Sequence, residues 1–240
     1  MILTNKIKPI DNIEYFCGFM AGSPMSCYIL HGENCDMLID TGMSIIRRDL
    51  DKWLGLFNVS YIFLTHAHVD HDGNAAYLHR RHGARIILSE ADNSLIGNFG
   101  SQKMRATMRK YRLRTVQQNI SGSVPLFRTD IYTPDIIVSE DDTDSLRALG
   151  FDADIIHLAG HTLGSLGVLS GDVLYCGDAF TAIWGKPDIT PHAASVLKMR
   201  KSIEKMLDIP CKWFATGHGL PVDADKAKRV IEDYLKILNP

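Results

Sequence analysis

The chain alternates short apolar runs with longer amphipathic segments over most of its length. A short apolar run bounded by Gly, Asp, Asn or Ser is typical of a strand, whereas apolar positions three and four apart indicate a helix. The apolar runs predict strands within residues 26–30, 35–40, 59–65, 84–90, 135–140, 152–160, 166–171, 172–178 and 211–219. The helical spacing predicts helices over residues 44–57, 73–83, 193–209 and 223–238.

Strands that alternate with helices predict an α/β architecture in which helices cover the sheets. At 240 residues the chain has the length of one sizeable domain, and we expect a single domain over residues 1–240. Its two halves show a faint similarity, because the runs MLIDTG and VLYCGDA both place an Asp close to a Gly at the end of an apolar strand.

Composition and charge argue against several classes of protein. An apolar content of 45% and a charged content of 22% argue against wholesale disorder. A net charge of −2 gives no overall attraction to nucleic acid or to an anionic membrane. No apolar stretch approaches the roughly 20 residues that a bilayer span needs.

The start of the chain and its cysteines indicate a cytoplasmic protein. Residues 1–12 lack the charged region and the long apolar core of a signal peptide. The five cysteines are odd in number and mostly lie inside apolar runs, which is typical of reduced core thiols and not of a disulfide framework. They are Cys17, Cys27, Cys35, Cys176 and Cys211.

Ligand-capable side chains follow four of the predicted strands. The segment FLTHAHVDHDG, residues 63–73, concentrates several of them, and later strands run into His161, Asp178 and His218. The C-terminal ends of strands are where α/β sheets usually place their sites, so we expect these groups to meet. The full set is His66, His68, Asp70, His71, His161, Asp178 and His218.

Seven such groups, five imidazoles and two carboxylates, exceed the four ligands of a closed zinc site. They suit two adjacent divalent ions with an open position between them. His66 and His68 lie two apart in extended chain and point to one side, while Asp70 and His71 lie on the turn into the next helix. A polar turn after a strand would explain a single His-x-His pair but not the whole set. We therefore predict two divalent ions, with zinc expected first and iron or manganese as alternatives.

The ordered motifs resemble those of the metallo-β-lactamase fold superfamily. THAHVDHDG is similar to the His-x-His-x-Asp-His motif of that family, AGHTLGS to its second histidine motif, YCGDAF to its Gly-Asp motif and TGHG to its last motif. MLIDTG resembles an early strand that ends in a structural Asp. The resemblance runs from residue 38 to residue 219, and it implies a four-layer αββα sandwich with metals at one edge, between the sheets.

Carried over by position, the resemblance also implies a role for each residue. The first metal would be held by His66, His68 and His161, the second by Asp70, His71 and His218, and both by a bridging Asp178. Asp40 would orient the motif turn without touching metal, because a carboxylate behind an imidazole fixes its tautomer and direction.

The implied reaction is hydrolysis of an acyl bond by a hydroxide that bridges the metals, with Asp70 able to pass a proton to the leaving group. The GDAF segment with Asp178 in place is closer to the glyoxalase II-like branch than to true β-lactamases, which favours a thioester. Glyoxalase II enzymes carry an extra helical region that binds glutathione, whereas this chain ends soon after His218. The resemblance therefore does not extend to glutathione as the thiol.

Other functions share parts of this pattern. A lactonase would use the same cluster, and a persulfide dioxygenase would use one iron on a subset of the ligands. A nucleic-acid phosphodiesterase is disfavoured because the chain lacks the large inserted domain of the RNA-cleaving relatives. A metal-binding protein without activity is disfavoured because the ligand set is complete. We expect a small-molecule substrate, and the sequence leaves the oligomeric state open.

Residues 91–133 interrupt the alternation and are predicted to be a lid over the metals. Between positions 93 and 129 the segment holds only basic charges, namely Lys103, Arg105, Arg109, Lys110, Arg112, Arg114 and Arg128. Met104, Met108 and Tyr111 recur at helical spacing among them. The segment would attract an anionic substrate tail if it covers the site, or it would be a solvated helix that pairs with acidic patches.

The remaining histidines fit ordinary structural positions. His79 and His82 are expected in solvent on a helix, His31 in a turn and His157 within a strand. His192 follows a Pro on a segment that could border the site, which makes it a weaker candidate.

Overall fold

The computed structural model describes residues 3–4, 10–20, 22–121, 124 and 129–238. Arg128 of the basic segment lies outside the described residues, as do residues 1–2 and 5–9 at the start of the chain.

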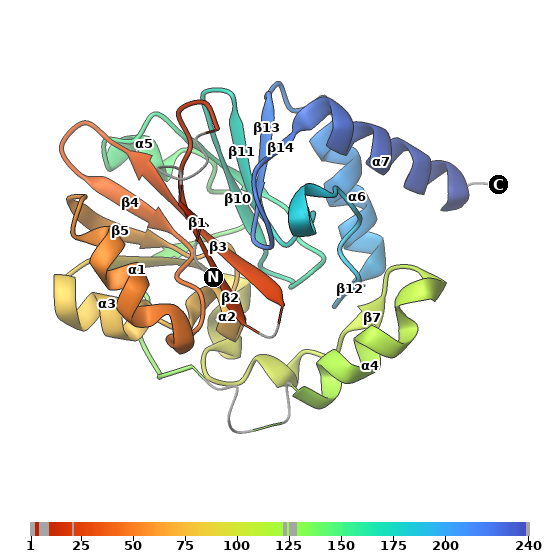
Figure 1. Cartoon of the computed structure of the whole chain (residues 1–240), viewed down its shortest axis with the longest axis horizontal. Helices are drawn as coiled ribbons and strands as arrows, with labels where there is room; N and C mark the ends of the chain where they lie inside the picture. Colours follow the sequence, from red (N-terminus) through yellow and green to blue (C-terminus); the bar gives the residue numbers. More distant parts are fainter. Residues whose placement is uncertain (1–2, 5–9, 21, 122–123, 125–128, 239–240) are drawn as a thin grey trace.

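Two β-sheets face each other at the centre of the molecule (Figure 1). The larger sheet has the order β1-β2-β3-β4-β5-β6-β8, with strands Leu3–Thr4, Glu14–Met20, Ser23–His31, Asp36–Ile39, Val59–Phe63, Arg85–Ser89 and Ile136–Val138. The smaller sheet has the order β14-β13-β11-β10-β9, with strands Val222–Asp223, Trp213–Thr216, Val173–Gly177, Leu166–Ser170 and Asp154–His157. The parallel pairs β4–β5, β5–β6 and β11–β13 align the C-terminal ends of these strands at one edge.

Helices cover the outer face of each sheet. On the larger sheet lie α1 (Arg47–Leu54) and α3 (Ala75–His82), and on the smaller sheet lie α6 (Val196–Asp208) and α7 (Ala224–Leu238). Two shorter helices are α2 (Val69–Asp72), in the first histidine motif, and α5 (Ser145–Ala148). The predicted four-layer αββα sandwich is therefore confirmed.

Apolar side chains fill all three spaces between the layers. Phe63 of β5 and Val168 of β10 meet in the central core between the sheets. Leu50 of α1 packs in the core under the larger sheet, and Ile231 of α7 packs in the core under the smaller sheet. Because each sheet is buried on both faces, its strands read as nearly continuous apolar runs in the sequence.

The predicted helices and strands are present, with ends shifted by a few residues. Helix α3 ends where the sequence predicts, because Gly83 adopts a left-handed conformation (φ 70°) and its N–H donates to the carbonyl of His79. All five cysteines are free, and Cys17, Cys27 and Cys176 are buried. Within the described part of the chain, no helix has both the length and the apolar character that crossing a bilayer requires.

The expected helical course through Met104 and Met108 is wrong. The chain there is extended, with β7 (Arg105–Ala106) followed by the short 3₁₀ turn η4 (Arg109–Tyr111), and the helix α4 begins only at Arg112 and runs to Ser121. Strand β7 pairs antiparallel with β12 (His192–Ala193). Thr107 adds two hydrogen bonds, from its N–H to Pro191 O (3.0 Å) and from its hydroxyl to Thr190 O (2.6 Å). These long-range bonds hold the segment extended against its local helical spacing.

Candidate metal centre

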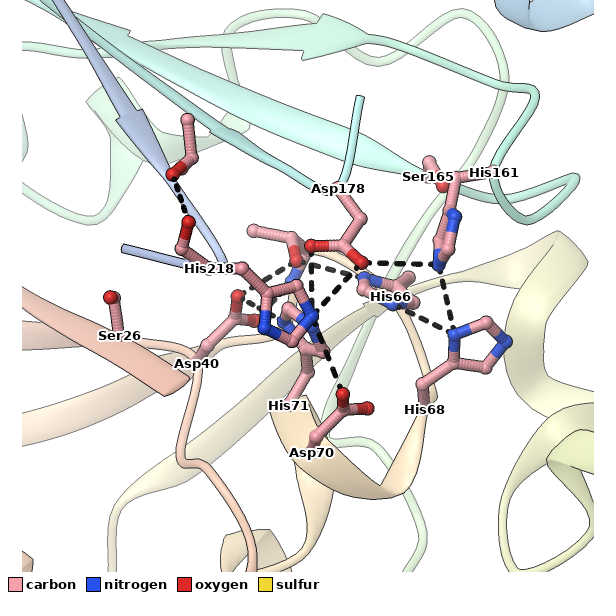
Figure 2. A network of polar contacts seen from close by, with 12 residues as sticks. Ser26, Asp40, His66, His68, Asp70, His71, His161, Ser165, Asp178 and His218 are labelled. Carbon is pink, nitrogen blue, oxygen red and sulfur yellow. Dashed lines mark hydrogen bonds and ion pairs between the residues drawn. The ribbon is translucent and has the colours of Figure 1, made fainter. Parts of the chain in front are cut away.

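The seven predicted residues come together at the edge where the strands end (Figure 2). His66 follows β5, His161 follows β9, Asp178 follows β11 and His218 follows β13. Helix α2 supplies Asp70 and His71, with His68 immediately before its first residue. The structure thus brings together every residue that the sequence selected for the site, while their roles as metal ligands stay a prediction.

Three imidazoles converge through their nitrogens. His66 Nε2 lies 3.1 Å from His68 Nδ1, and the same His68 atom lies 3.0 Å from His161 Nε2. All three side chains are buried. We call these residues the first donor group.

Asp70, His71 and His218 form the second donor group. His218 Nε2 lies 3.4 Å from Asp70 Oδ2. His71 is fully buried, whereas the Asp70 side chain keeps 28% of its surface exposed. The second group therefore faces the opening of the site and the first group lies deeper.

Asp178 lies between the two donor groups. One carboxylate oxygen is 3.4 Å from His161 Nε2 and 3.3 Å from His218 Nε2, and the other is 3.5 Å from His71 Nε2. Figure 2 shows this carboxylate pointing down into the ring of imidazoles. A group in that place can interact with a cation on either side.

The donor atoms fit divalent metal. Tetrahedral ligands at 2.0–2.1 Å from zinc are about 3.3–3.4 Å apart, and the separations here are 3.0–3.5 Å. Among the described residues, His71 Nε2 and Asp178 Oδ1 are buried without any hydrogen-bond partner. A buried polar atom without a partner is costly, and a cation would relieve that cost. Imidazole and carboxylate donors are a set that zinc, iron and manganese all accept.

Oxygen atoms outside the cluster hold the imidazoles in place. The far nitrogen of His71 contacts Asp40 Oδ2 at 2.8 Å, that of His161 contacts His192 O at 3.0 Å, and that of His218 contacts Pro24 O at 2.6 Å. His66 Nδ1 contacts the hydroxyl of Thr65 at 3.1 Å. Each of these four rings can therefore donate an N–H outward and direct its other nitrogen into the site.

Asp40 organises the turn beneath the site, as its resemblance to the family's structural Asp implied. It accepts hydrogen bonds from the N–H and the hydroxyl of Thr65, both at 2.8 Å, in addition to its contact with His71. Its backbone is left-handed (φ 58°), a conformation that Asp tolerates better than most residues. This turn at the end of β4 is what points the carboxylate at the histidine motif.

Two glycines leave room for the ligands. Gly177 precedes Asp178 with φ 49°, and a Cβ there would come within 2.5 Å of the Thr65 hydroxyl. A Cβ on Gly217 would collide with the His71 ring and approach Asp178 Oδ1 at 2.6 Å. The glycines of the Gly-Asp and Gly-His motifs are therefore packing requirements of the site.

Burial and charge divide the imidazoles into two kinds. Burial, reinforced by the neighbouring rings, holds the pKa of His66 and of His68 well below the usual value. Burial acts in the same direction on His71, but Asp40 and Asp178 outweigh it and raise the pKa of His71 to about 9. Asp178 and Asp70 likewise raise the pKa of His218 well above its usual value, against the effect of burial. Without metal, the second donor group carries its positive charge as protons that a cation would displace.

Sequence reasoning missed Asp92, a buried carboxylate that joins the loops of the first donor group. It accepts hydrogen bonds from the N–H of Ala67 (3.1 Å), the N–H of Gly164 (2.9 Å) and the hydroxyl of Thr162 (2.7 Å). Ala67 lies between His66 and His68, and Thr162 follows His161. The available signal was an Asp shortly after the strand β6, the same position relative to a strand that marked the ligands.

The other histidines lie largely as expected. His157 is in β9 and contacts the carbonyl of Asp142, and the His79 side chain is 41% exposed. His192 does border the site, because its ring lies 5.7 Å from that of His161 and its carbonyl contacts the same side chain. His192 therefore supports a proposed ligand through its backbone.

Known proteins resemble this chain in sequence and in fold. The family model for the metallo-beta-lactamase superfamily matches residues 22–218. Metallo-beta-lactamase fold-containing protein ST1585 of Sulfurisphaera tokodaii is 24% identical over 217 residues, which cover 87% of this chain and 76% of that protein. A hydroxyacylglutathione hydrolase of Shewanella pealeana is 32% identical over 176 residues, which cover 73% of this chain and 47% of the relative. This chain thus matches about half of the length of that hydrolase.

Solved structures agree on the fold. The metallo-beta-lactamase FEZ-1 from Legionella gormanii superposes with a TM-score of 0.65 at 15% identity, over 95% of this chain and 93% of that one. At this identity the likeness concerns the fold alone. The family model spans the described site from before the first histidine motif to its last histidine. The chain belongs to the metallo-beta-lactamase superfamily.

Proposed function

We propose that this chain is a hydrolase of thioesters that works with two divalent metal ions, zinc being the first expectation. The observation that carries the proposal is the pair of donor groups joined by Asp178, beside a cavity of about 300 Å³ that reaches Asp70. Two closely spaced donor groups that open onto a cavity favour a reaction centre over a closed structural site.

The first donor group would hold one ion, the second would hold the other, and Asp178 would contact both. When bound, such ions supply a water of lowered pKa and a Lewis acid for the acyl carbonyl. The buried oxygens behind the imidazoles keep the donor nitrogens aimed at the ions before they bind, which reduces the reorganisation that binding requires.

Asp70 is the proposed proton carrier. Oδ2 of Asp70 lies toward His218, and the residue also lines the cavity. Although burial opposes the effect, His218 and His71 hold the pKa of Asp70 well below its usual value, so the carboxylate is ionised at neutral pH. An ionised carboxylate would bind the second ion through one oxygen, and an oxygen left free of the ion would relay a proton to the departing thiolate.

Cys176, the thiol two residues before Asp178, does not compete as a nucleophile. Cys176 is buried, its Sγ contacts the carbonyl of Ala215 at 3.6 Å, and burial raises its pKa far above neutrality. A thiol that cannot ionise is a poor nucleophile. The reaction is therefore assigned to the metal centre.

The choice of a thioester is supported by the relative from Shewanella pealeana, whose name records hydrolysis of an acyl-glutathione. Because the match covers less than half of that relative, glutathione itself is not carried over as the thiol.

Metal analysis followed by a substrate panel tests this function. Protein purified without chelators should contain about two ions per chain and should hydrolyse thioesters faster than matched lactones and phosphodiesters. Apoprotein prepared with a chelator should be inactive and regain activity with zinc. A single iron with consumption of oxygen would replace this proposal with the persulfide dioxygenase alternative, and preferential lactone hydrolysis would change the substrate class.

A further inference from the structure

The cavity beside Asp70 has one apolar wall and one polar wall. It is lined by Met20, Ser23, Met25, Met43, Val69, Asp70, Phe99, Arg114, Gln117, Gln118 and Ser121. At about 30 Å³ for each non-hydrogen atom, a volume of about 300 Å³ holds roughly ten such atoms. That is the size of a short acyl chain with a terminal functional group.

The apolar wall lies next to the metal centre. Val69 is the residue between His68 and Asp70, and the ring of Phe99 lies 5.5 Å from that of His68 in an edge-on contact. Met20, Met25 and Met43 complete this wall. Unbranched thioether side chains adapt to flexible aliphatic groups, so this wall suits an alkyl segment.

Four polar residues of the lining come from one face of helix α4 and form the polar wall. Arg114, Gln117, Gln118 and Ser121 lie on adjacent turns of this helix and all line the cavity. The helix is fixed in place, because Asn119 exchanges two hydrogen bonds of 2.9 Å with the backbone of Met104. The polar wall is therefore one face of a docked helix whose other faces are largely exposed.

Its place in the cavity lining distinguishes Arg114 from the other basic residues. It is the only cation among the described residues that line the cavity, where Asp70 is the only carboxylate. Arg105, Arg109 and Arg112 are exposed, as is Arg114, but they do not line the cavity, and Lys110 lies 3.3 Å from Asp188. The anionic group that the basic segment was expected to attract would therefore meet Arg114.

We propose that this cavity binds a short aliphatic segment of a thioester substrate and that Arg114 binds an anionic group at the far end of that segment. The inference rests on the proposed thioesterase function and specifies its substrate class. Gln117 and Gln118 would add amide donors beside the guanidinium, which suits a carboxylate. The anionic group belongs either to the acyl part or to the thiol part of the substrate.

Kinetics on matched thioesters test the pocket. Hexanoyl and 5-carboxypentanoyl thioesters of the neutral thiol N-acetylcysteamine differ by a terminal carboxylate, and hexanoyl 3-mercaptopropionate carries the carboxylate on the thiol instead. The wild-type enzyme should prefer one anionic substrate over the neutral one in kcat/KM, chiefly through a lower KM. Arg114→Gln should reduce this preference about tenfold, as expected for loss of one charge-assisted hydrogen bond. Arg112→Gln, on the same helix but outside the cavity, should keep the wild-type preference.

Direct binding separates this inference from the proposed function. Hexanedioate should bind the zinc-loaded protein more tightly than hexanoate in calorimetry, and Arg114→Gln should remove the difference. If this binding difference is found but no thioester is hydrolysed, the pocket stands and the proposed function fails. If thioesters are hydrolysed without any preference for a carboxylate, or if Arg112→Gln and Arg114→Gln lower it equally, the pocket inference is wrong and the function stands.

Discussion

Replacing Asp178 with Asn tests the proposed metal centre at the one residue that both donor groups share. The exchange keeps the size of the side chain and removes one negative charge. In the structure that charge lies within 3.3–3.5 Å of imidazole nitrogens from both groups. A neutral amide oxygen at this position would be a weaker partner for two cations at once.

The expected magnitude follows from Coulomb's law. Two unit charges 4 Å apart interact by about 4 kcal/mol at an effective dielectric constant of 20, and a dication doubles the interaction. The amide oxygen and local rearrangement recover part of this, so we expect a net loss of about 4 kcal/mol, or roughly a thousandfold, in the affinity for one ion. Turnover should fall by at least as large a factor at limiting metal.

The assay is a zinc titration of apoprotein against a chromogenic chelator, with kcat/KM on a thioester measured on the same samples. His79→Gln is the control, since this histidine is 41% exposed and lies on α3 outside the cluster. The assignment of Asp178 as the shared ligand would be refuted if Asp178→Asn bound both zinc ions with wild-type affinity. It would also be refuted if Asp178→Asn and His79→Gln lost zinc affinity equally.

Three further changes probe the surroundings of the site. Asp92→Asn should lower the Co²⁺ affinity of one of the two sites by about 10- to 100-fold in a titration followed by visible absorbance. The reason is that Asp92 bonds to the loops of the first donor group. An equal loss of affinity at both sites would contradict this. Gly217→Ala should lower the free energy of unfolding of the metal-loaded protein by about 1–3 kcal/mol in chemical denaturation and should release metal, because the added Cβ would collide with His71 and Asp178. Unchanged stability and metal content would show that the loop can shift to make room. Zinc affinity should rise between pH 6.5 and 8.5, by about tenfold per pH unit for each proton displaced. The reason is that a proton on His71, whose pKa is raised to about 9, competes with the metal throughout this range. A zinc affinity that does not change with pH would show that this imidazole is already neutral in the apoprotein.

The residues of the site were predictable because they depend on local order in the sequence. An apolar run followed by a His or an Asp identifies a strand end, and parallel strands bring such ends to one edge. His161, Asp178 and His218 were found in this way although they are far apart along the chain. The layered fold was predictable for the same reason, since buried strands and amphipathic helices carry distinct hydrophobic patterns.

Features held by long-range hydrogen bonds were not predictable. The position of Asp92 shortly after a strand marks it as a candidate for the site, but it does not indicate that Asp92 will accept bonds from Ala67 and Thr162, which belong to different loops. The helical spacing of Met104 and Met108 was misleading because pairing with β12 overrides local preference in this segment. The position of Arg114 in the cavity likewise depends on where α4 docks and not on its charge.

The pairing of β7 with β12 limits how this protein can be engineered. Strand β12 begins at His192, whose carbonyl supports His161, so the segment 91–133 and a proposed ligand depend on the same pair of strands. A chimera that exchanged the whole of residues 91–133 with another family member would disturb that support along with substrate choice. The segment better suited to exchange is the ten-residue helix α4 (Arg112–Ser121), which lines the cavity and comes after β7 in the sequence. Libraries confined to this helix would vary the wall of the proposed pocket and leave unchanged the hydrogen bond that supports His161.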